Sequence, residues 1–486
     1  MVIKTPEWVK NAIFYQIYPD TFARKVPDRQ KWLLDVPLED WEAPPTSQGY
    51  KGGNLWGVID KLDYLQDLGV AALYLTPIFR SACNHRYHTQ DYYAIDPLLG
   101  DREAFDHLLK TAHDKGFKVV LDGVFNHASR GFFFFNDILE NGPNSPWLDW
   151  FKIEGWPLSA YDGSRPANYV SWIDYRALPQ FNHDNPAVRE YIMQVGEYWL
   201  QQGIDGWRLD VPNCVEAEGF WEEFRERVKA VNPEAYIVGE IVSDATQWLD
   251  GKQFDGVMNY PFARLTACFV IGDRLDKETI PSFYKPYETL DAAEYAKGLE
   301  ELLARHPWEI QLTQLNLLDS HDTSRFLTMA GGDRTSLQLA TLLLFTFPGT
   351  PNIFYGDEIG IEGGKDPDGR KGFPTEEKWE QETLTYHKQL IQIRKKYTAL
   401  RTGEYRVITA QENVYVFARI LGEEGLIIAV NNGEDKTEIQ IDKIDKVSSI
   451  LQTKPSQIIY GEGSINWHDN QLKITMNPRS GLVIAP

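Results

Sequence analysis

Cysteine is scarce in this chain. Only three residues of this type occur among 486, at Cys83, Cys214 and Cys268, an odd number with no paired spacing. A disulfide framework or a zinc site is therefore not expected. Few cysteines without such a pattern are typical of a protein from a reducing compartment, so the sequence predicts a cytoplasmic protein.

Long apolar runs and an excess of positive charge are also missing. The opening stretch MVIKTPEWVKN lacks the apolar core of a signal peptide, and the longest apolar run, residues 339–347, is too short to span a bilayer. The 49 Lys and Arg residues face 70 Asp and Glu residues, giving a net charge of -21. This charge argues against nucleic acid or an anionic membrane as partner, whereas a neutral substrate remains allowed.

Aromatic residues, by contrast, are abundant, with 15 Trp, 24 Tyr and 24 Phe. Sugars are among the ligands that stack on flat aromatic rings. Core packing is the commoner reason for an aromatic side chain, so composition alone leaves both readings open.

Strand-like apolar runs alternate with amphipathic helical stretches through most of the chain. A helix is expected over residues 102–115, with Gly116 as its glycine cap, and another over residues 218–231. Eight strand-helix units predict an α/β fold, a (β/α)8 TIM barrel. The eight runs are residues 12–22, 71–79, 119–127, 203–211, 235–240, 254–260, 312–322 and 350–358.

The alternation is interrupted once and then ends. About fifty residues rich in Gly, Pro, Asn and aromatics predict an inserted B subdomain over 128–177, because loops of that length are usually functional. Short alternating runs predict a C-terminal antiparallel β-sandwich over 400–486. The barrel would then comprise residues 1–127 and 178–399.

The stretch QGIDGWRLDVPNCV places Arg208 and Asp210 two residues apart on a predicted strand, so both side chains point the same way. A neighbouring guanidinium lowers the pKa of a carboxyl group, which predicts an ionised Asp210. A lone pair of this kind is more often a structural ion pair than a catalytic one.

Other polar side chains follow the predicted strands, where the carboxyl ends of barrel strands face one pocket. A carboxylate in such a position is often only a helix cap. Acids and histidines at four strand ends are harder to explain as caps, and glycoside hydrolysis requires two carboxyl groups, one to attack and one to donate a proton. Asp210 suits attack, and Glu240, after an apolar run, suits proton donation. The residues concerned are Asp122, Asn126, His127, Arg208, Asp210, Glu240, His321 and Asp322.

At these residues the chain resembles the α-amylase family, glycoside hydrolase family 13. It carries DGVFNH, GWRLDVPN, GEI and LLDSHD in the family's order, with PNIFYGDEIG as a fifth motif. GGKDPDGRKG and SHDTSR are most similar to the neopullulanase, cyclomaltodextrinase and maltogenic amylase branch. The resemblance implies a hydrolase of α-1,4 or α-1,6 bonds in α-glucan oligosaccharides or polysaccharides, including cyclodextrins, pullulan and branched glucans.

The resemblance also implies roles for individual residues in a retaining mechanism. Asp210 would form the covalent intermediate, Glu240 would be the acid and base, and Asp322 would stabilise the distorted sugar through its hydroxyls. The implied substrate-binding residues are Arg208, which orients the nucleophile, His127 and His321 on sugar hydroxyls, Tyr87 as the platform beneath the sugar, and Asp366 with Arg370 at the next sugar outward.

Several positions depart from the family pattern. Gln180 stands where lysine is common, Pro212 and Cys214 where alanine and glutamate are usual, and His88 where aspartate is common. The lost acidic and basic groups motivate the hypothesis that the enzyme debranches, cleaving α-1,6 bonds beside or above α-1,4 bonds. The first strand is followed by TFARKVPDRQ instead of the calcium-binding spacing of some relatives, so neither a metal nor a cofactor is expected.

The branch usually begins with an additional β-domain, whereas the barrel pattern here starts at about residue 12. Dimers built on that domain are therefore not expected, although another homodimer is allowed. Three alternative functions make different demands on the sequence. A metal-dependent amidohydrolase would need an HxH pair after the first strand, a non-catalytic carbohydrate-binding barrel would usually have lost one of the three acids, and no residue separates a hydrolase from a transglycosylase.

Overall fold

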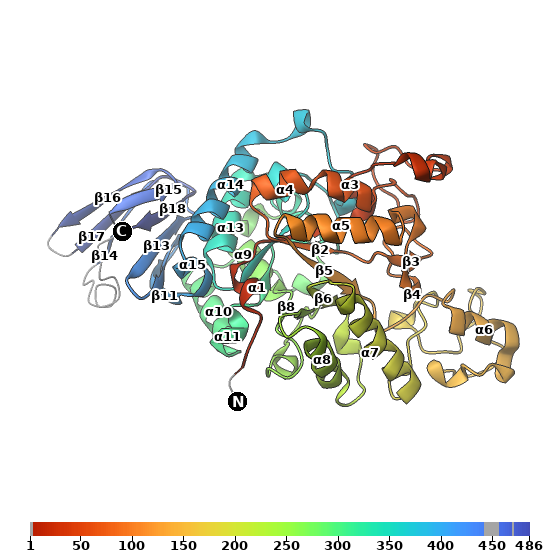
Figure 1. The fold of residues 1–486 in the computed structure, drawn as a ribbon. Helices are drawn as coiled ribbons and strands as arrows, with labels where there is room; N and C mark the ends of the chain where they lie inside the picture. The colour runs from red at the N-terminus through yellow and green to blue at the C-terminus, as the bar shows by residue number, and fades with distance from the viewer. Residues whose placement is uncertain (1–2, 442–455, 469–470) are drawn as a thin grey trace. The chain divides into compact units, whose positions relative to one another are not determined.

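The computed structural model describes residues 3–441, 456–468 and 471–486 (Figure 1). The chain divides into two compact units, which are described in turn. The first comprises Met1–Pro6, Tyr15–Met258 and Arg370–Phe373, and the second comprises Glu7–Phe14, Asn259–Gly369 and Pro374–Pro486.

Most of the parallel strands in the first unit are short and wholly buried, because their residues are largely apolar. They pair in the order β8-β7-β6-β5-β2-β1, and the pairs from β2 to β8 are parallel. Because both faces of such a parallel sheet are covered, its strands read as continuous apolar runs in the sequence. The strands are β1 (Phe14–Ile17), β2 (Ala72–Leu75), β5 (Lys118–Gly123), β6 (Gly206–Leu209), β7 (Tyr236–Gly239) and β8 (Gly256–Val257), with a separate hairpin of β3 (Phe79–Ser81) and β4 (Thr89–Ile95).

Helices separate most of these strands along the chain (Figure 1), and only a short 3-10 turn, Thr246–Trp248, lies between β7 and β8. Asp101 caps the start of α5 by accepting a hydrogen bond from the amide of Ala104. Gly116 follows the helix with a left-handed φ of 84°, which confirms the predicted glycine cap. The helices of this unit are α2 (Pro19–Phe22), α3 (Leu55–Asp60), α4 (Leu62–Leu68), α5 (Arg102–Asp114), α6 (Phe133–Asn141), α7 (Pro186–Gln201) and α8 (Phe220–Val231).

The second unit contains two parallel strands of the barrel sheet, β9 (Leu315–Asn316) and β10 (Thr350–Phe354). Asp291 and Glu294 form a complete capping box at the start of α10. The helices of this unit are α1 (Glu7–Asn11), α9 (Tyr260–Val270), α10 (Ala292–Ala304), α11 (Trp308–Gln311), α12 (Phe326–Met329), α13 (Arg334–Thr346), α14 (Gln381–Lys396) and α15 (Ala399–Thr402).

Eight strands alternating with helices form the eight-stranded sheet of a (β/α)8 barrel, so the predicted fold class is confirmed. Several predicted strands were too long. The run from residue 12 is a strand only to Ile17 and continues as α2, because Pro19 supplies a helical first turn. The runs from 254 and 312 keep only two paired residues each.

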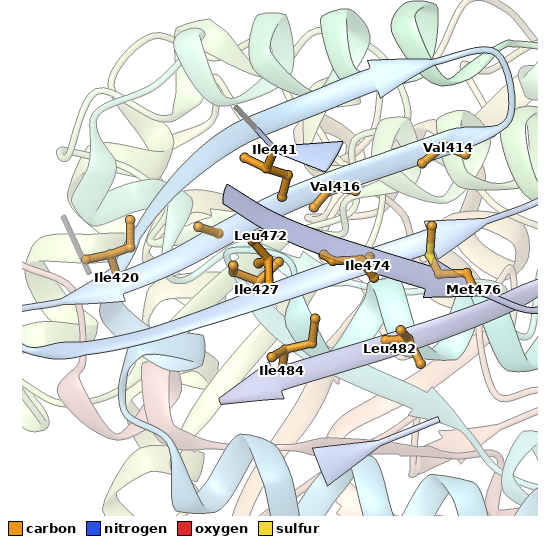
Figure 2. Packing of buried hydrophobic residues seen from close by; sticks show 12 residues of the cluster. Val414, Val416, Ile420, Ile427, Ile441, Leu472, Ile474, Met476, Leu482 and Ile484 are labelled. Carbon is orange, nitrogen blue, oxygen red and sulfur yellow. The ribbon is translucent and has the colours of Figure 1, made fainter. Parts of the chain in front are cut away.

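The C-terminal strands form two antiparallel sheets, ordered β11-β12-β13-β18-β15 and β14-β17-β16. Their apolar side chains pack into one core, in which Val416, Ile427, Ile474 and Leu482 are buried (Figure 2). This confirms the predicted sandwich. The strands are β11 (Glu404–Gln411), β12 (Val414–Leu421), β13 (Glu424–Asn431), β14 (Thr437–Ile441), β15 (Gln457–Tyr460), β16 (Gly463–His468), β17 (Gln471–Met476) and β18 (Ser480–Ala485).

Two of the short alternating runs that predict the sandwich, residues 404–420 and 471–486, each form two strands. The first turns at Glu412, which has a φ of 50°, to give β11 and β12, and the last gives β17 and β18. The exposed strand β16 was not predicted, since its residues are mostly polar. Among the described residues, no helix is both long and apolar enough to cross a bilayer.

Candidate active site

Three neighbouring strands of the first unit end in charged side chains. Asp122 lies in β5, opposite Arg208 of β6, while Asp210 directly follows β6 and Glu240 directly follows β7. Because these strands are parallel, their carboxyl ends share one edge of the sheet. The predicted candidates from this part of the chain are therefore brought together.

The guanidinium of Arg208 is the centre of this group and is fully buried. Its Nη1 atom lies 2.9 Å from Oδ1 of Asp122 and 2.9 Å from Oδ1 of Asp210. Its Nη2 atom lies 2.7 Å from Oε1 of Glu240. One cation thus contacts three carboxyl groups, in a site where charge is poorly screened. We call these four residues the Arg208 cluster.

The backbone between Asp210 and Glu240 is strained. Val211, directly after Asp210, has φ 37° and ψ 49°, a left-handed conformation that a β-branched residue rarely adopts. Its amide lies 3.2 Å from Oε2 of Glu240, to which it donates a hydrogen bond. The strained peptide therefore directs an N–H group at the second carboxyl group of the pair.

The pKa of Asp210 differs from the prediction. Burial raises the pKa of Asp210 well above its usual value, while Arg208 lowers it and the charges of Glu240 and Asp122 raise it further. The prediction of an ionised carboxylate was wrong because it counted the guanidinium but neither the burial nor the two other acids. Three buried carboxyl groups around one cation are expected to retain a proton.

The same burial raises the pKa of Asp122 to about 6. Between about pH 4 and pH 6 the folded chain then holds a proton that the unfolded chain has released, so stability falls as the pH rises through this window. The corresponding decrease in the free energy of unfolding, up to about 3 kcal/mol, is absent in Asp122→Asn because asparagine does not titrate. We expect the Tm of the variant minus that of the wild type to increase from pH 4 to pH 6 and to level off above it. A difference that stays constant across this range, measured by scanning calorimetry, would contradict the raised pKa.

Two tyrosines complete the hydrogen bonding of Asp122. The hydroxyl groups of Tyr74 and Tyr87 donate to its Oδ2 atom over 2.8 Å and 2.9 Å. Tyr87 was predicted as a substrate platform and is half-buried, with its hydroxyl directed at the Arg208 cluster. Tyr74 was not predicted, because nothing in its apolar strand indicates that its hydroxyl reaches Asp122 on the neighbouring strand.

His127 lies after β5 and is buried. Its ring stacks on Trp172 at 5.5 Å between centroids. Its Nδ1 atom lies 3.1 Å from Nδ2, the side-chain nitrogen of Asn126. Within the described part of the chain, its buried Nε2 atom has no hydrogen-bond partner. Burial lowers the pKa of His127 to about 3, so the ring is neutral and can exchange hydrogen bonds with a neutral ligand. Trp172 was missed because it lies in a segment without regular periodicity.

The unusual residues near this site contact one another. Gln180 donates from Nε2 to the Asn126 side chain over 3.1 Å and to the carbonyl of Cys214 over 3.0 Å. Both Gln180 and Cys214 are half-buried. Gln180 and Cys214, which both depart from the family pattern, therefore contact each other beside the Arg208 cluster.

The remaining predicted residues are distributed over both units. Arg370 belongs to the first unit, is buried and lies over the ring of Tyr18 at 5.3 Å. His321 and Asp322 follow β9 in the second unit, where Nε2 of the buried His321 lies 3.2 Å from Oδ2 of Asp322. Asp366 is an exposed residue of the second unit.

Comparison with known proteins agrees with this arrangement. Residues 16–382 match the family described as alpha amylase, catalytic domain, and residues 403–484 match the alpha-amylase C-terminal domain. Neopullulanase 2 of Thermoactinomyces vulgaris is 40% identical over 491 residues, which cover 99% of this chain and 79% of the relative.

Two solved structures extend the likeness over the full length. The debranching enzyme from Nostoc punctiforme is 58% identical, with a TM-score of 0.93 and 100% coverage of both chains. The cyclic α-maltosyl-(1→6)-maltose hydrolase from Arthrobacter globiformis is 33% identical, with a TM-score of 0.86 and 100% coverage of both chains. The chain therefore belongs to the α-amylase family and is a glycoside hydrolase that acts on α-glucosidic bonds.

Proposed function

We propose that Asp210 and Glu240 carry out a double displacement at the anomeric carbon of a glucose residue. The observation that supports this most directly is that both carboxyl groups contact one guanidinium, Asp210 through Nη1 and Glu240 through Nη2 of Arg208. Adjacent nitrogens of one guanidinium hold two carboxyl groups close together, and a short separation of about 5–5.5 Å is typical of retaining enzymes.

In the first step, a carboxylate oxygen of Asp210 attacks the anomeric carbon while the bond to the glycosidic oxygen breaks. Glu240 gives its proton to that oxygen, and a glycosyl ester of Asp210 remains. In the second step, Glu240 takes a proton from water, whose oxygen attacks the anomeric carbon and releases Asp210. The raised pKa of Asp210 adds a requirement, since the retained proton must reside on Glu240 when the substrate is bound.

The other predicted residues receive roles in substrate binding. Tyr87 forms the platform beneath the sugar, and His127 offers its unpartnered Nε2 atom to a sugar hydroxyl. Asp322 stabilises the distorted sugar through its hydroxyls, His321 holds a further hydroxyl, and Asp366 with Arg370 binds the next sugar outward. The roles of these last four residues are supported by the family motifs in which they lie.

We also propose that the enzyme cleaves α-1,6 bonds beside or above α-1,4 bonds in branched α-glucans such as starch or glycogen fragments. The support is the contact between Gln180 and Cys214, where an acid and a base usual in the branch are both absent. The debranching enzyme, at 58% identity, is named for such an activity. Without a charged pair, this side of the site can admit a leaving group of different shape.

Linkage preference is tested with a branched and a linear malto-oligosaccharide of equal length. We expect the branched substrate to be cleaved with the higher kcat/KM, and linkage analysis to show a broken α-1,6 bond. The double variant Gln180→Lys, Cys214→Glu restores the usual charges, so we expect a shift of about 10-fold or more toward the linear substrate. Faster cleavage of the linear substrate by the wild type would overturn the proposal. The same reactions at high sugar concentration would separate hydrolysis from glycosyl transfer.

Domain limits and location complete the proposal. We assign residues 1–127 and 178–399 to the barrel, 128–177 to the B subdomain and 400–486 to the sandwich. Residues 179–181 return to the end of β5, where the amide of Ala128 donates to the carbonyl of Pro179 over 3.0 Å. A cytoplasmic location is supported by three free cysteines and by the net charge of -21.

A further inference from the structure

One cysteine and two histidines meet in the turn between β3 and β4. Cys83, His85 and His88 each direct one potential ligand atom into the same space, and these atoms all lie within 4.8 Å of one another. All three side chains are half-buried, so an ion could reach them from solvent. None of them belongs to the Arg208 cluster, and the mechanism proposed above uses none of them.

The spacing matches that of a tetrahedral metal ion. Zinc binds sulfur at about 2.3 Å and nitrogen at about 2.0–2.1 Å, which places two such ligands about 3.6 Å apart at the tetrahedral angle. Sγ of Cys83 and Nδ1 of His85 are 3.5 Å apart. The rings of His85 and His88 cross edge to face, with centroids 5.0 Å apart. Little movement would therefore be needed to close three bonds around one ion.

The turn is held in this shape by residues other than the ligands. Arg86, between the two histidines, has a left-handed φ of 61° and is buried, with Nη1 lying 3.3 Å from Oδ1 of Asp20. Asn84 donates to the carbonyl of Gly49 over 2.7 Å, and Ser81 donates to the carbonyl of His88 over 2.9 Å. The backbone of the turn is thus preorganised, which lowers the entropy cost of binding.

The local charges act in both directions. The positive charge of Arg130 lies near enough to His88 to oppose the binding of a cation there. Nη1 of Arg130 donates a hydrogen bond to the carbonyl of Ala160 over 2.6 Å, and its guanidinium lies over the ring of Tyr161 at 4.2 Å. Ionisation of Cys83 on metal binding would offset its charge. The amide of Tyr87 lies 3.3 Å from Nδ1 of His85, and an ion would replace this long hydrogen bond.

We propose that Cys83, His85 and His88 form a binding site for one Zn²⁺ ion, with a fourth position open to water. One thiolate and two imidazoles form a borderline-soft ligand set that suits zinc and disfavours Mg²⁺ and Ca²⁺, which prefer oxygen. These ligands read C-x-H-x-x-H in the sequence, a pattern that the spacing between cysteines does not reveal. The three ligands are distinct from Asp210 and Glu240, so metal binding can be measured apart from the reaction proposed for those two residues.

The test uses the untagged full-length protein, first dialysed against a chelator and then titrated with Co²⁺ as a spectroscopic substitute for Zn²⁺. We expect one equivalent to bind, with the visible bands of tetrahedral Co²⁺ and a thiolate-to-cobalt charge-transfer band, and Zn²⁺ to displace it. In Cys83→Ser the charge-transfer band should vanish, and in His88→Gln the affinity for Zn²⁺ should fall by more than about 10-fold, since even changes outside the ligands cost that much.

Cys268→Ser is the matched control, because Cys268 is a buried cysteine of the second unit and should leave binding unchanged. Far-ultraviolet circular dichroism and thermal unfolding establish that each variant is folded. Two results would overturn the proposal: no tetrahedral Co²⁺ spectrum in the wild type, or Zn²⁺ affinity in folded Cys83→Ser and His88→Gln equal to that of the wild type. Neither result would bear on glucan hydrolysis.

Discussion

Asp210→Asn is expected to lower kcat on a malto-oligosaccharide by at least about 10⁴-fold while the protein remains folded. The amide cannot form the glycosyl ester, so the two-step route is lost. The amide oxygen can still accept the hydrogen bond that Nη1 of Arg208 donates to Asp210 over 2.9 Å, and for this reason the cluster should persist. Initial rates with a chromogenic α-glucoside and product sizing on a glucan measure the effect.

Asp205→Asn provides the matched control. Asp205 directly precedes β6, whereas Asp210 directly follows it, so the two acids lie at opposite ends of this strand. The carboxylate of Asp205 binds Lys118 and His113 over 2.8 Å each. The same change of acid to amide there should reduce Tm but leave kcat nearly unaltered. A small nucleophile such as azide is expected to restore turnover to Asp210→Gly on a substrate with an activated leaving group, giving a product of inverted configuration. More than a tenth of wild-type activity in Asp210→Asn would refute the nucleophile assignment.

The second large effect is expected for Glu240→Gln, and it should depend on the leaving group. On a glucan, whose leaving oxygen needs a proton, kcat should fall by roughly 10²–10⁴-fold. On a glycoside with a strongly acidic phenol as leaving group, bond cleavage needs no acid, whereas breakdown of the ester still needs a base. A rapid burst of phenol followed by slow turnover is therefore expected in stopped-flow measurements.

The substitution could also disturb the cluster, because Glu240 forms an ion pair with Arg208 and accepts a hydrogen bond from the amide of Val211. Glutamine keeps one oxygen acceptor, which limits this effect. Glu216→Gln, an exposed acid on the loop after β6, is the control and should show wild-type rates with both substrates. Equal losses on the glucan and on the activated glycoside, without a burst, would exclude Glu240 as the proton donor.

Much of this architecture was predictable, because it follows from the order of the strands along the chain and from the type of residue at each position. Apolar runs predicted the eight barrel strands, and parallel pairing then required Asp122, Asp210 and Glu240 to meet at one edge. The family motifs identified the same residues independently. What failed were strand lengths, as in the run ending at Phe22, since a continuous apolar run does not distinguish a strand from a buried helical turn.

The electrostatic state of the site could not be predicted from neighbours in the sequence. Arg208 and Asp210 are two residues apart, but the raised pKa of Asp210 depends on burial and on Glu240, thirty residues further along the chain. Contacts of the same kind were invisible for Tyr74, whose hydroxyl reaches Asp122 from the neighbouring strand. In each case the deciding partner is supplied by the fold rather than by the local pattern.

The left-handed peptide at Val211 links heat resistance to turnover at one position. Its backbone conformation costs free energy that a glycine would not incur, of the order of 1–3 kcal/mol. Yet its amide is the group that reaches Glu240, while its own N-terminal neighbour is Asp210. Relaxing this residue would loosen the mutual orientation of the two acids, so selection for a more robust protein and selection for a faster one pull in opposite directions here.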